Sequence, residues 1–84
     1  MNTRELVADL KYIGLPATDV VVGGIADEHY CIARTDDDQW EVYYYERGEK
    51  RRRVVVATEH IACTYLFGLL AFEQVMAQRL VVAP

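Results

Sequence analysis

The sequence predicts an α+β domain: a small antiparallel three- to four-stranded meander with N- and C-terminal helices packed on one face, in the order α-β-β-β-α. Apolar residues recur with helical periodicity near both ends of the chain, and strand-like runs joined by polar turns fill the middle. The 84 residues are enough for one hydrophobic core but not for two, so residues 1–84 should form a single domain.

The first helix is expected from Thr3 to Ile13. Leu6, Leu10 and Ile13 recur at i, i+4 and i+7 and therefore form one apolar stripe. Thr3 can accept a hydrogen bond as the N-terminal cap. Gly14 follows the last periodic residue and can take the left-handed conformation that ends a helix.

The middle of the chain is expected to contain a short edge strand or an extended loop, followed by three strands. The first segment lies within Ala17–Ile25, and the strands are His29–Thr35, Trp40–Glu46 and Arg51–Ala57. The connections between the strands, Asp36–Gln39 and Arg47–Glu49, are rich in turn-forming residues. Two such short connections make the three strands antiparallel neighbours.

Side chains alternate between the two faces of a strand, so each face can be assigned from the sequence. On the central strand, the more apolar set is expected to face the helices: Trp40, Val42 and Tyr44. The other set is expected to lie on an open face available to a partner: Glu41, Tyr43 and Tyr45. On the preceding strand, the core face is expected to carry Cys31 and Ala33.

The second helix is expected to begin after Thr58, which can cap it, and to run to about Arg79. It is apolar nearly all round between Ile61 and Phe72, and such a helix is usually buried on more than one side. Whatever the sheet and the first helix leave uncovered would be an exposed apolar patch and a candidate interface. The tail Leu80–Pro84 would add a short strand or fray.

The net charge of −4 argues against nucleic-acid binding by the chain as a whole. The N-terminus lacks the pattern of a signal peptide, and the longest apolar stretch, Ala62–Phe72, is too short to span a bilayer. Cys31 and Cys63 lie in apolar contexts without metal-binding spacing. This favours reduced core cysteines in a cytoplasmic protein, with a disulfide between them as the alternative.

The motifs that carry chemistry are missing. His29 and His60 match no metal-binding motif, and Cys63 lies among apolar helix residues that would make its thiol inert. Gly23-Gly24 precedes acidic residues and matches no phosphate-binding loop. We therefore expect no catalytic residue, no metal, no cofactor and no enzyme activity.

Charge is unevenly distributed along the strands. Residues 26–46 contain seven acidic side chains and one basic one, whereas residues 47–53 contain five basic side chains and one acidic one. One interpretation is cross-strand pairing and protection of a sheet edge. Another is a bipolar surface that binds a protein, with the acidic loop entering a basic substrate pocket. A third is RNA binding through arginines and stacking tyrosines, which the nearby acidic loop opposes.

The segment from Glu28 to Leu70 resembles small immunity proteins of bacterial polymorphic toxin systems. The resemblance lies in a strand with an aromatic–Cys pair, an acidic loop, a W-x-V-Y-Y-x-E-R-G segment and a T-E-x-x-A-C-x-Y-L segment. The matching positions are Tyr30, Cys31, Asp36 to Asp38, Trp40, Val42, Tyr43, Tyr44, Glu46, Arg47, Gly48, Thr58, Glu59, Ala62, Cys63, Tyr65 and Leu66. The basic run Lys50–Arg53 and the triple tyrosine depart from the family pattern.

The resemblance implies a cytoplasmic inhibitor that protects its producer from a cognate secreted toxin. The chain is most similar to the partners of NAD-hydrolysing toxins of the tuberculosis-necrotizing-toxin type. A nuclease or an ADP-ribosyltransferase as the toxin is the alternative. We expect partner-binding residues on the open sheet face and the hairpin ends: Asp36, Asp37, Asp38, Glu41, Tyr43, Tyr45, Glu46 and Arg47. The alternative is a structural module that forms a homodimer through the second helix.

Overall fold

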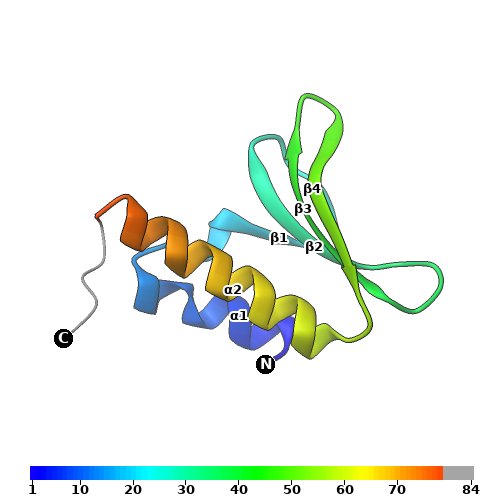
Figure 1. Cartoon of the computed structure of the whole chain (residues 1–84), viewed down its shortest axis with the longest axis horizontal. Coiled ribbons are helices and arrows are strands. Elements are labelled where there is room, and N and C mark those ends of the chain that lie inside the picture. Colours follow the sequence, from blue (N-terminus) through cyan, green and yellow to red (C-terminus); the bar gives the residue numbers. More distant parts are fainter. Residues whose placement is uncertain (79–84) are drawn as a thin grey trace.

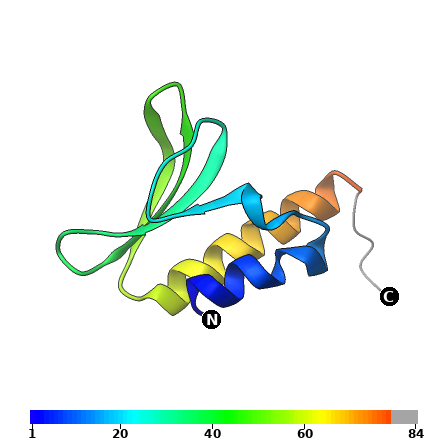
Figure 2. The same cartoon turned by 180° about the vertical axis from the view of Figure 1, so that it is seen from behind.

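A computed structural model describes residues 1–78 and has two layers, a four-stranded sheet and a pair of helices on one of its faces (Figures 1 and 2). This arrangement confirms the predicted α+β class with its N- and C-terminal helices. The elements in chain order are α1 (Thr3–Asp9), the 3-10 helices η1 (Leu10–Ile13) and η2 (Ala17–Asp19), β1 (Val20–Val22), β2 (His29–Arg34), β3 (Trp40–Glu46), β4 (Glu49–Val56) and α2 (Glu59–Met76).

The strands lie in the order β1-β2-β3-β4. The antiparallel meander predicted from the short turns is confirmed for β2, β3 and β4. β1 is a strand rather than an extended loop, and it pairs in parallel with β2, so the sheet is mixed. The loop from Gly23 to Glu28 carries the chain back to the start of β2. Gly23 has a φ of 77°, a backbone conformation that glycine adopts without strain.

Helix α1 is capped by Asn2, so the prediction of Thr3 as the cap is wrong. The Asn2 side chain accepts a hydrogen bond from Glu5 N at 2.8 Å, and Glu5 Oε1 accepts one from Asn2 N at 3.0 Å. This reciprocal pair is a capping box. The chain then tightens into η1, and Gly14 ends it with a φ of 77°, as predicted. The predicted apolar stripe is buried: Leu6, Leu10 and Ile13.

Helix α2 starts as predicted, because Thr58 Oγ1 accepts a hydrogen bond from Ile61 N at 3.2 Å. The helix ends at Met76. The predicted end at Arg79 and the tail Leu80–Pro84 lie outside the described residues. None of the helices within residues 1–78 combines the length and apolarity needed to cross a membrane.

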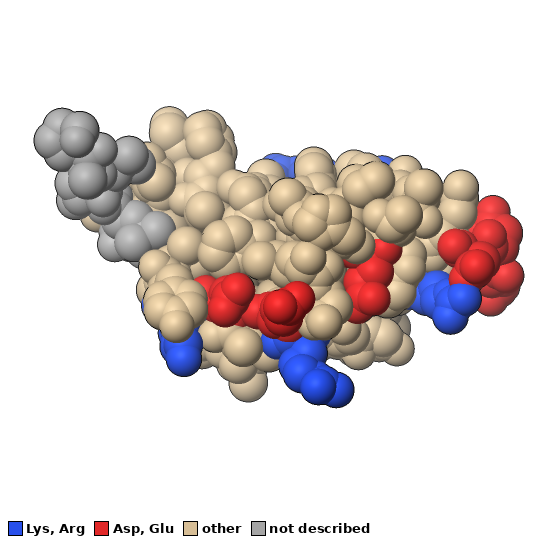
Figure 3. Space-filling model, turned by 90° about the horizontal axis from the view of Figure 1, so that it is seen from below, with Lys and Arg blue, Asp and Glu red and all other residues tan. Residues whose placement is uncertain are grey.

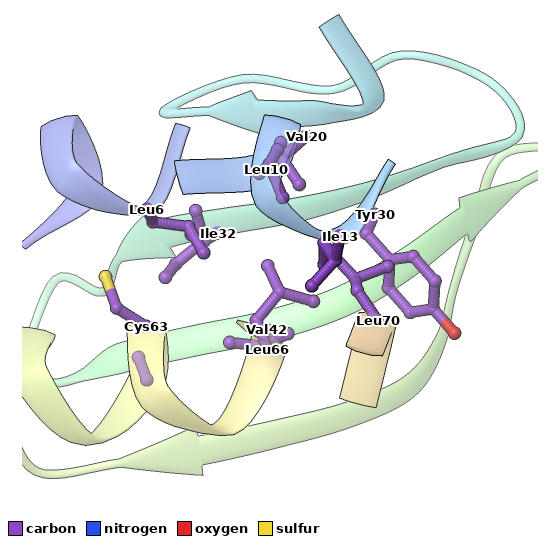
Figure 4. Close-up of a cluster of buried hydrophobic side chains, with 11 residues drawn as sticks. Leu6, Leu10, Ile13, Val20, Tyr30, Ile32, Val42, Cys63, Leu66 and Leu70 are labelled. Atoms are coloured by element: carbon purple, nitrogen blue, oxygen red, sulfur yellow. The ribbon is translucent and has the colours of Figure 1, made fainter. Parts of the chain in front are cut away.

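The hydrophobic core lies between the sheet and the helices (Figure 4). Its buried members are Leu6, Leu10, Ile13, Val20, Tyr30, Ile32, Val42, Ala62, Cys63, Leu66 and Leu70. The face predicted for β3 is confirmed, since three of its side chains belong to this core or pack against it: Trp40, Val42 and Tyr44.

The face predicted for β2 is wrong. Tyr30 pairs with Tyr44 and Ile32 pairs with Val42, so Tyr30 and Ile32 face the helices. Cys31 and Ala33 consequently lie on the opposite side of the sheet, which we call the outer face. Because β2 carries small or apolar side chains on both faces, alternation alone could not distinguish them.

Cys31 and Cys63 are both free and fully buried. Cys63 belongs to the helix-side core, whereas Cys31 lies on the outer face opposite Tyr43. The sheet therefore separates the two sulfur atoms. The expectation that both cysteines are buried and not paired with each other is confirmed, and the alternative of a disulfide between them is wrong.

Candidate partner-binding surface

The centre of the outer face is occupied by an internal ion-pair cluster. Glu41 is 7% exposed, and its carboxylate accepts hydrogen bonds from Lys50 Nζ at 2.7 Å and from Arg53 Nε at 2.6 Å. Both cations come from β4, the neighbouring strand. The cluster therefore joins two strands of the sheet, as cross-strand charge pairing predicts.

A β-bulge in β4 brings the two cations to one carboxylate. Residues three apart on a regular strand point to opposite faces, so Lys50 and Arg53 could not both reach Glu41. The pairing shifts between Val42 and Tyr44, which leaves one extra residue on β4. Arg52 lies in this irregular segment with a φ of 55°, in the left-handed region. The extra residue returns Arg53 to the face of Lys50.

The two cations govern the ionisation of Glu41. Burial alone would raise the pKa of this carboxyl group, but the hydrogen bonds and charges of Lys50 and Arg53 together outweigh burial. The pKa of Glu41 consequently lies below its ordinary value. Glu41 is therefore ionised, and its charge is balanced by Lys50 and Arg53 within the chain. Both of its carboxylate oxygens already accept hydrogen bonds.

Tyr43 is also buried, with only 3% of its surface exposed. Lys50 Nζ lies 4.6 Å from the centre of its ring, and the Tyr43 hydroxyl donates to Gly24 O at 3.4 Å. The β1–β2 loop therefore reaches the Tyr43 side chain from the outer side. The expectation that Glu41 and Tyr43 are open to a partner is wrong, because a cation cluster and a loop cover this part of the outer face.

The acidic loop between β2 and β3 is the most exposed of the predicted site segments. Asp36, Asp37 and Asp38 are all exposed. Figure 3 shows the loop as a dense group of acidic atoms at one end of the molecule, with basic atoms beside it. A concentrated negative charge at a protruding tip suits entry into a basic pocket.

Local hydrogen bonds fix the backbone of this acidic loop. Thr35 N donates to Gln39 O at 2.8 Å, and Gln39 N donates to Thr35 Oγ1 at 3.0 Å. Asp37 Oδ1 accepts from Thr35 Oγ1 at 2.5 Å, and Arg34 pairs with Asp38. The loop is therefore held in one shape before any partner binds, which reduces the ordering cost of association.

The other predicted residues lie at the opposite end of β3. Arg47 and Gly48 form a two-residue hairpin turn with φ values of 52° and 79°, as a type I′ turn requires. Arg47 N donates to Asp27 Oδ1 at 2.8 Å, which fastens the turn to the β1–β2 loop. Arg47 is exposed, whereas Tyr45 and Glu46 are half-buried.

The predicted residues therefore do not form one continuous site. The acidic loop and the Arg47 turn lie at the two ends of β3, whose seven residues span about 20 Å. Between them lies the sealed centre formed by Glu41 and Tyr43. We call the exposed loop Asp36–Asp38 the acidic tip and take it as the accessible part of the predicted surface.

A cleft on the helix side was not predicted from the sequence. Two adjoining cavities, of about 490 and 410 Å³, share Tyr30, Tyr44 and Glu73. The Tyr30 hydroxyl donates to Glu73 Oε1 at 2.7 Å across this cleft. Glu73, the one acidic residue of α2 after its first turn, was the signal that could have indicated a polar contact there.

The basic run Lys50–Arg53 is largely neutralised within the chain. Lys50 and Arg53 bind Glu41, and Arg51 lies 3.6 Å from Glu46 and 3.2 Å from Glu49. Arg52 lines the second cavity of the cleft. These contacts agree with cross-strand pairing and edge protection, the first interpretation of the charge pattern.

Comparisons with protein-family models, with curated proteins and with solved structures found no match to this chain. Within residues 1–78, no three His, Cys, Asp or Glu side chains are grouped as they would be to hold a metal ion.

Proposed function

We propose that the chain is a protein-binding inhibitor, an immunity protein that acts in the cytoplasm and neutralises a cognate secreted toxin. The class of toxin that the sequence resemblance favours is one that hydrolyses NAD. Two lines support the proposal: the resemblance of the segment Glu28–Leu70 to immunity proteins, and an exposed acidic tip whose backbone is fixed by local hydrogen bonds.

The acidic tip is the observation that carries the proposal. A toxin that binds a phosphate-containing substrate such as NAD needs basic residues in its substrate pocket. Carboxylates of Asp36 and Asp37 would pair with those residues and occupy the place of the substrate phosphates. Because the tip protrudes and its backbone is fixed, it can enter a pocket without reorganising the sheet behind it.

RNA binding is the less favoured function, because it requires free cations beside exposed aromatic rings. Here Lys50 and Arg53 are engaged by Glu41, and Tyr43 is buried. The chain would first have to break its own ion-pair cluster to present this run to phosphates.

The test is co-expression with the toxic domain that the proposal expects to be encoded next to this gene, with growth and cellular NAD as readouts. The parent chain should restore both. The variant Asp36→Asn/Asp37→Asn, which keeps the shape of the loop, should fail to do so. The control Asp9→Asn/Glu49→Gln removes the same charge elsewhere and should protect like the parent. Equal protection by the two double variants, or no toxic domain beside the gene, would count against the proposal.

A further inference from the structure

The outward face of α2 carries no charged side chain over four turns. Between Ile61 and Met76, the exposed positions of this helix are Ile61, Thr64, Tyr65, Gly68, Phe72 and Met76. These positions recur at helical spacing and form one continuous face. Figure 3, which views the helical side, shows a broad area of uncharged atoms. We call these six residues the α2 face.

The apolar side chains of the α2 face are large and well exposed. Ile61 is 46% exposed, Tyr65 41%, Phe72 61% and Met76 66%. Each of them presents on the order of 100 Å² to solvent, so the patch is about 400 Å². The largest apolar patch on a typical monomer has about this size and is often functional.

Gly68 lies at the middle of this face. Nine residues of α2 precede it and eight follow it. A Cβ atom built on Gly68 would meet nothing within 4 Å, so the chain itself does not require glycine there. The missing side chain instead opens the centre of the face to close approach by another backbone. The distance between two packed helices is set by the side chains at their crossing point.

We propose that the α2 face binds a second copy of this chain, with two α2 helices packed antiparallel about a two-fold axis at Gly68. That symmetry places Tyr65 of one copy near Phe72 of the other, and the reverse contact repeats across the axis. Since the face is uncharged, the symmetric contact brings no like charges together.

The second copy fits the α2 face better than it fits the exposed sheet edge. The β4 edge carries the charged run Lys50–Arg53, and charged side chains on an edge strand oppose pairing with a second copy. A patch of about 400 Å² is roughly half of what a standard interface buries on each partner. The dimer should therefore be reversible and dependent on concentration.

The experiment is sedimentation equilibrium of the full chain from about 10 µM to about 1 mM, the range in which a weak dimer dissociates. The parent should shift from monomer to dimer over this range. Phe72→Glu and Gly68→Arg should each raise the dissociation constant at least tenfold. Both are exposed helix positions, and arginine favours a helix more than glycine does, so the fold should persist. Far-UV circular dichroism checks that it does.

Tyr12 supplies the matched control, because it is 70% exposed and lies outside α2. Tyr12→Glu should dimerise like the parent. A parent that stays monomeric to about 1 mM would overturn the proposal. So would variants of Gly68 and Phe72 that dimerise like the parent. If the parent is monomeric and only a chain ending at Gln78 dimerises, the occupant of the α2 face would be the last six residues of the chain and not a second copy. A monomeric parent whose Phe72→Glu variant loses toxin inhibition would assign the face to the toxin.

Discussion

The Tyr30 hydroxyl donates a 2.7 Å hydrogen bond to Glu73 Oε1 and so joins β2 to the C-terminal half of α2. Tyr30 is only 9% exposed. Burial first, and then the neighbouring Glu73 carboxylate, raise the pKa of Tyr30 to about 12. The bond therefore couples the packing of the helix on the sheet to the protonation of one phenol.

This coupling predicts a loss of stability in strong base. The folded protein holds the Tyr30 proton more tightly than the unfolded chain, whose tyrosines titrate near pH 10. The contribution is full below about pH 10 and is lost as the pH rises to about 12, with a total on the order of 2 kcal/mol. Urea unfolding at a series of pH values measures it. Tyr30→Phe should flatten this alkaline slope, and an unchanged slope would contradict the assignment.

The Glu41 cluster predicts a loss of stability in acid. Because the folded-state pKa of Glu41 lies below its ordinary value, its contribution is present above about pH 4.5 and is lost as the pH falls further. Glu41→Gln should lower the free energy of unfolding at pH 7 by about 1–2 kcal/mol and flatten the acid limb. Glu49→Gln, which alters an exposed ion pair, should change stability by less than about 0.5 kcal/mol. Equal effects of the two substitutions would show that Glu41 does not form a buried ion-pair cluster between β3 and β4.

The bulge in β4 predicts an unusual preference for glycine within a strand. Arg52 has a φ of 55°, which a residue with a Cβ adopts only at a cost of about 1 kcal/mol. Arg52→Gly should therefore be more stable than Arg52→Ala by about that amount in urea unfolding. At Arg51, which has no positive φ, the order should reverse. The same order at both positions would argue against the bulge.

The sequence was sufficient for most of the fold because local signals agreed with the packing. Trp40, Val42 and Tyr44 alternate with less apolar neighbours, so the face of β3 was predictable. Parallel pairing of β1 was not, since a three-residue strand carries no signal of its direction. The prediction for the face of β2 was wrong because Cys31 and Ala33 have the small, apolar side chains expected in a core. They lie on the outer side of the sheet, which the β1–β2 loop buries.

The candidate site was predictable only in part, for a related reason. Exposure of the acidic tip follows from its turn composition, which is a local property. The burial of Glu41 depends on a bulge that brings Lys50 and Arg53 to the same face. Strict alternation places those two residues on opposite faces. The burial of Glu41 beneath them could therefore not be predicted from strand periodicity.

Cys31 and Cys63 are expected to be chemically inert in the folded protein, because both thiols are buried. Cys31 and Cys63 have no exposed surface, and burial raises the pKa of Cys63 to about 11 and also raises that of Cys31. Neither should react with a thiol reagent such as DTNB in the folded protein at pH 8, and both should react in guanidinium chloride. Fast reaction of either cysteine without denaturant would contradict the placement of that side chain.

Calorimetric titration of the purified toxin domain measures whether the acidic tip forms the proposed toxin-binding surface. We predict that Asp36→Asn/Asp37→Asn weakens binding at least tenfold, which is about 1.4 kcal/mol, whereas the control Asp9→Asn/Glu49→Gln binds like the parent. The loss should shrink at high salt, because exposed charges are screened. An unchanged dissociation constant for Asp36→Asn/Asp37→Asn would rule out the acidic tip as the binding surface.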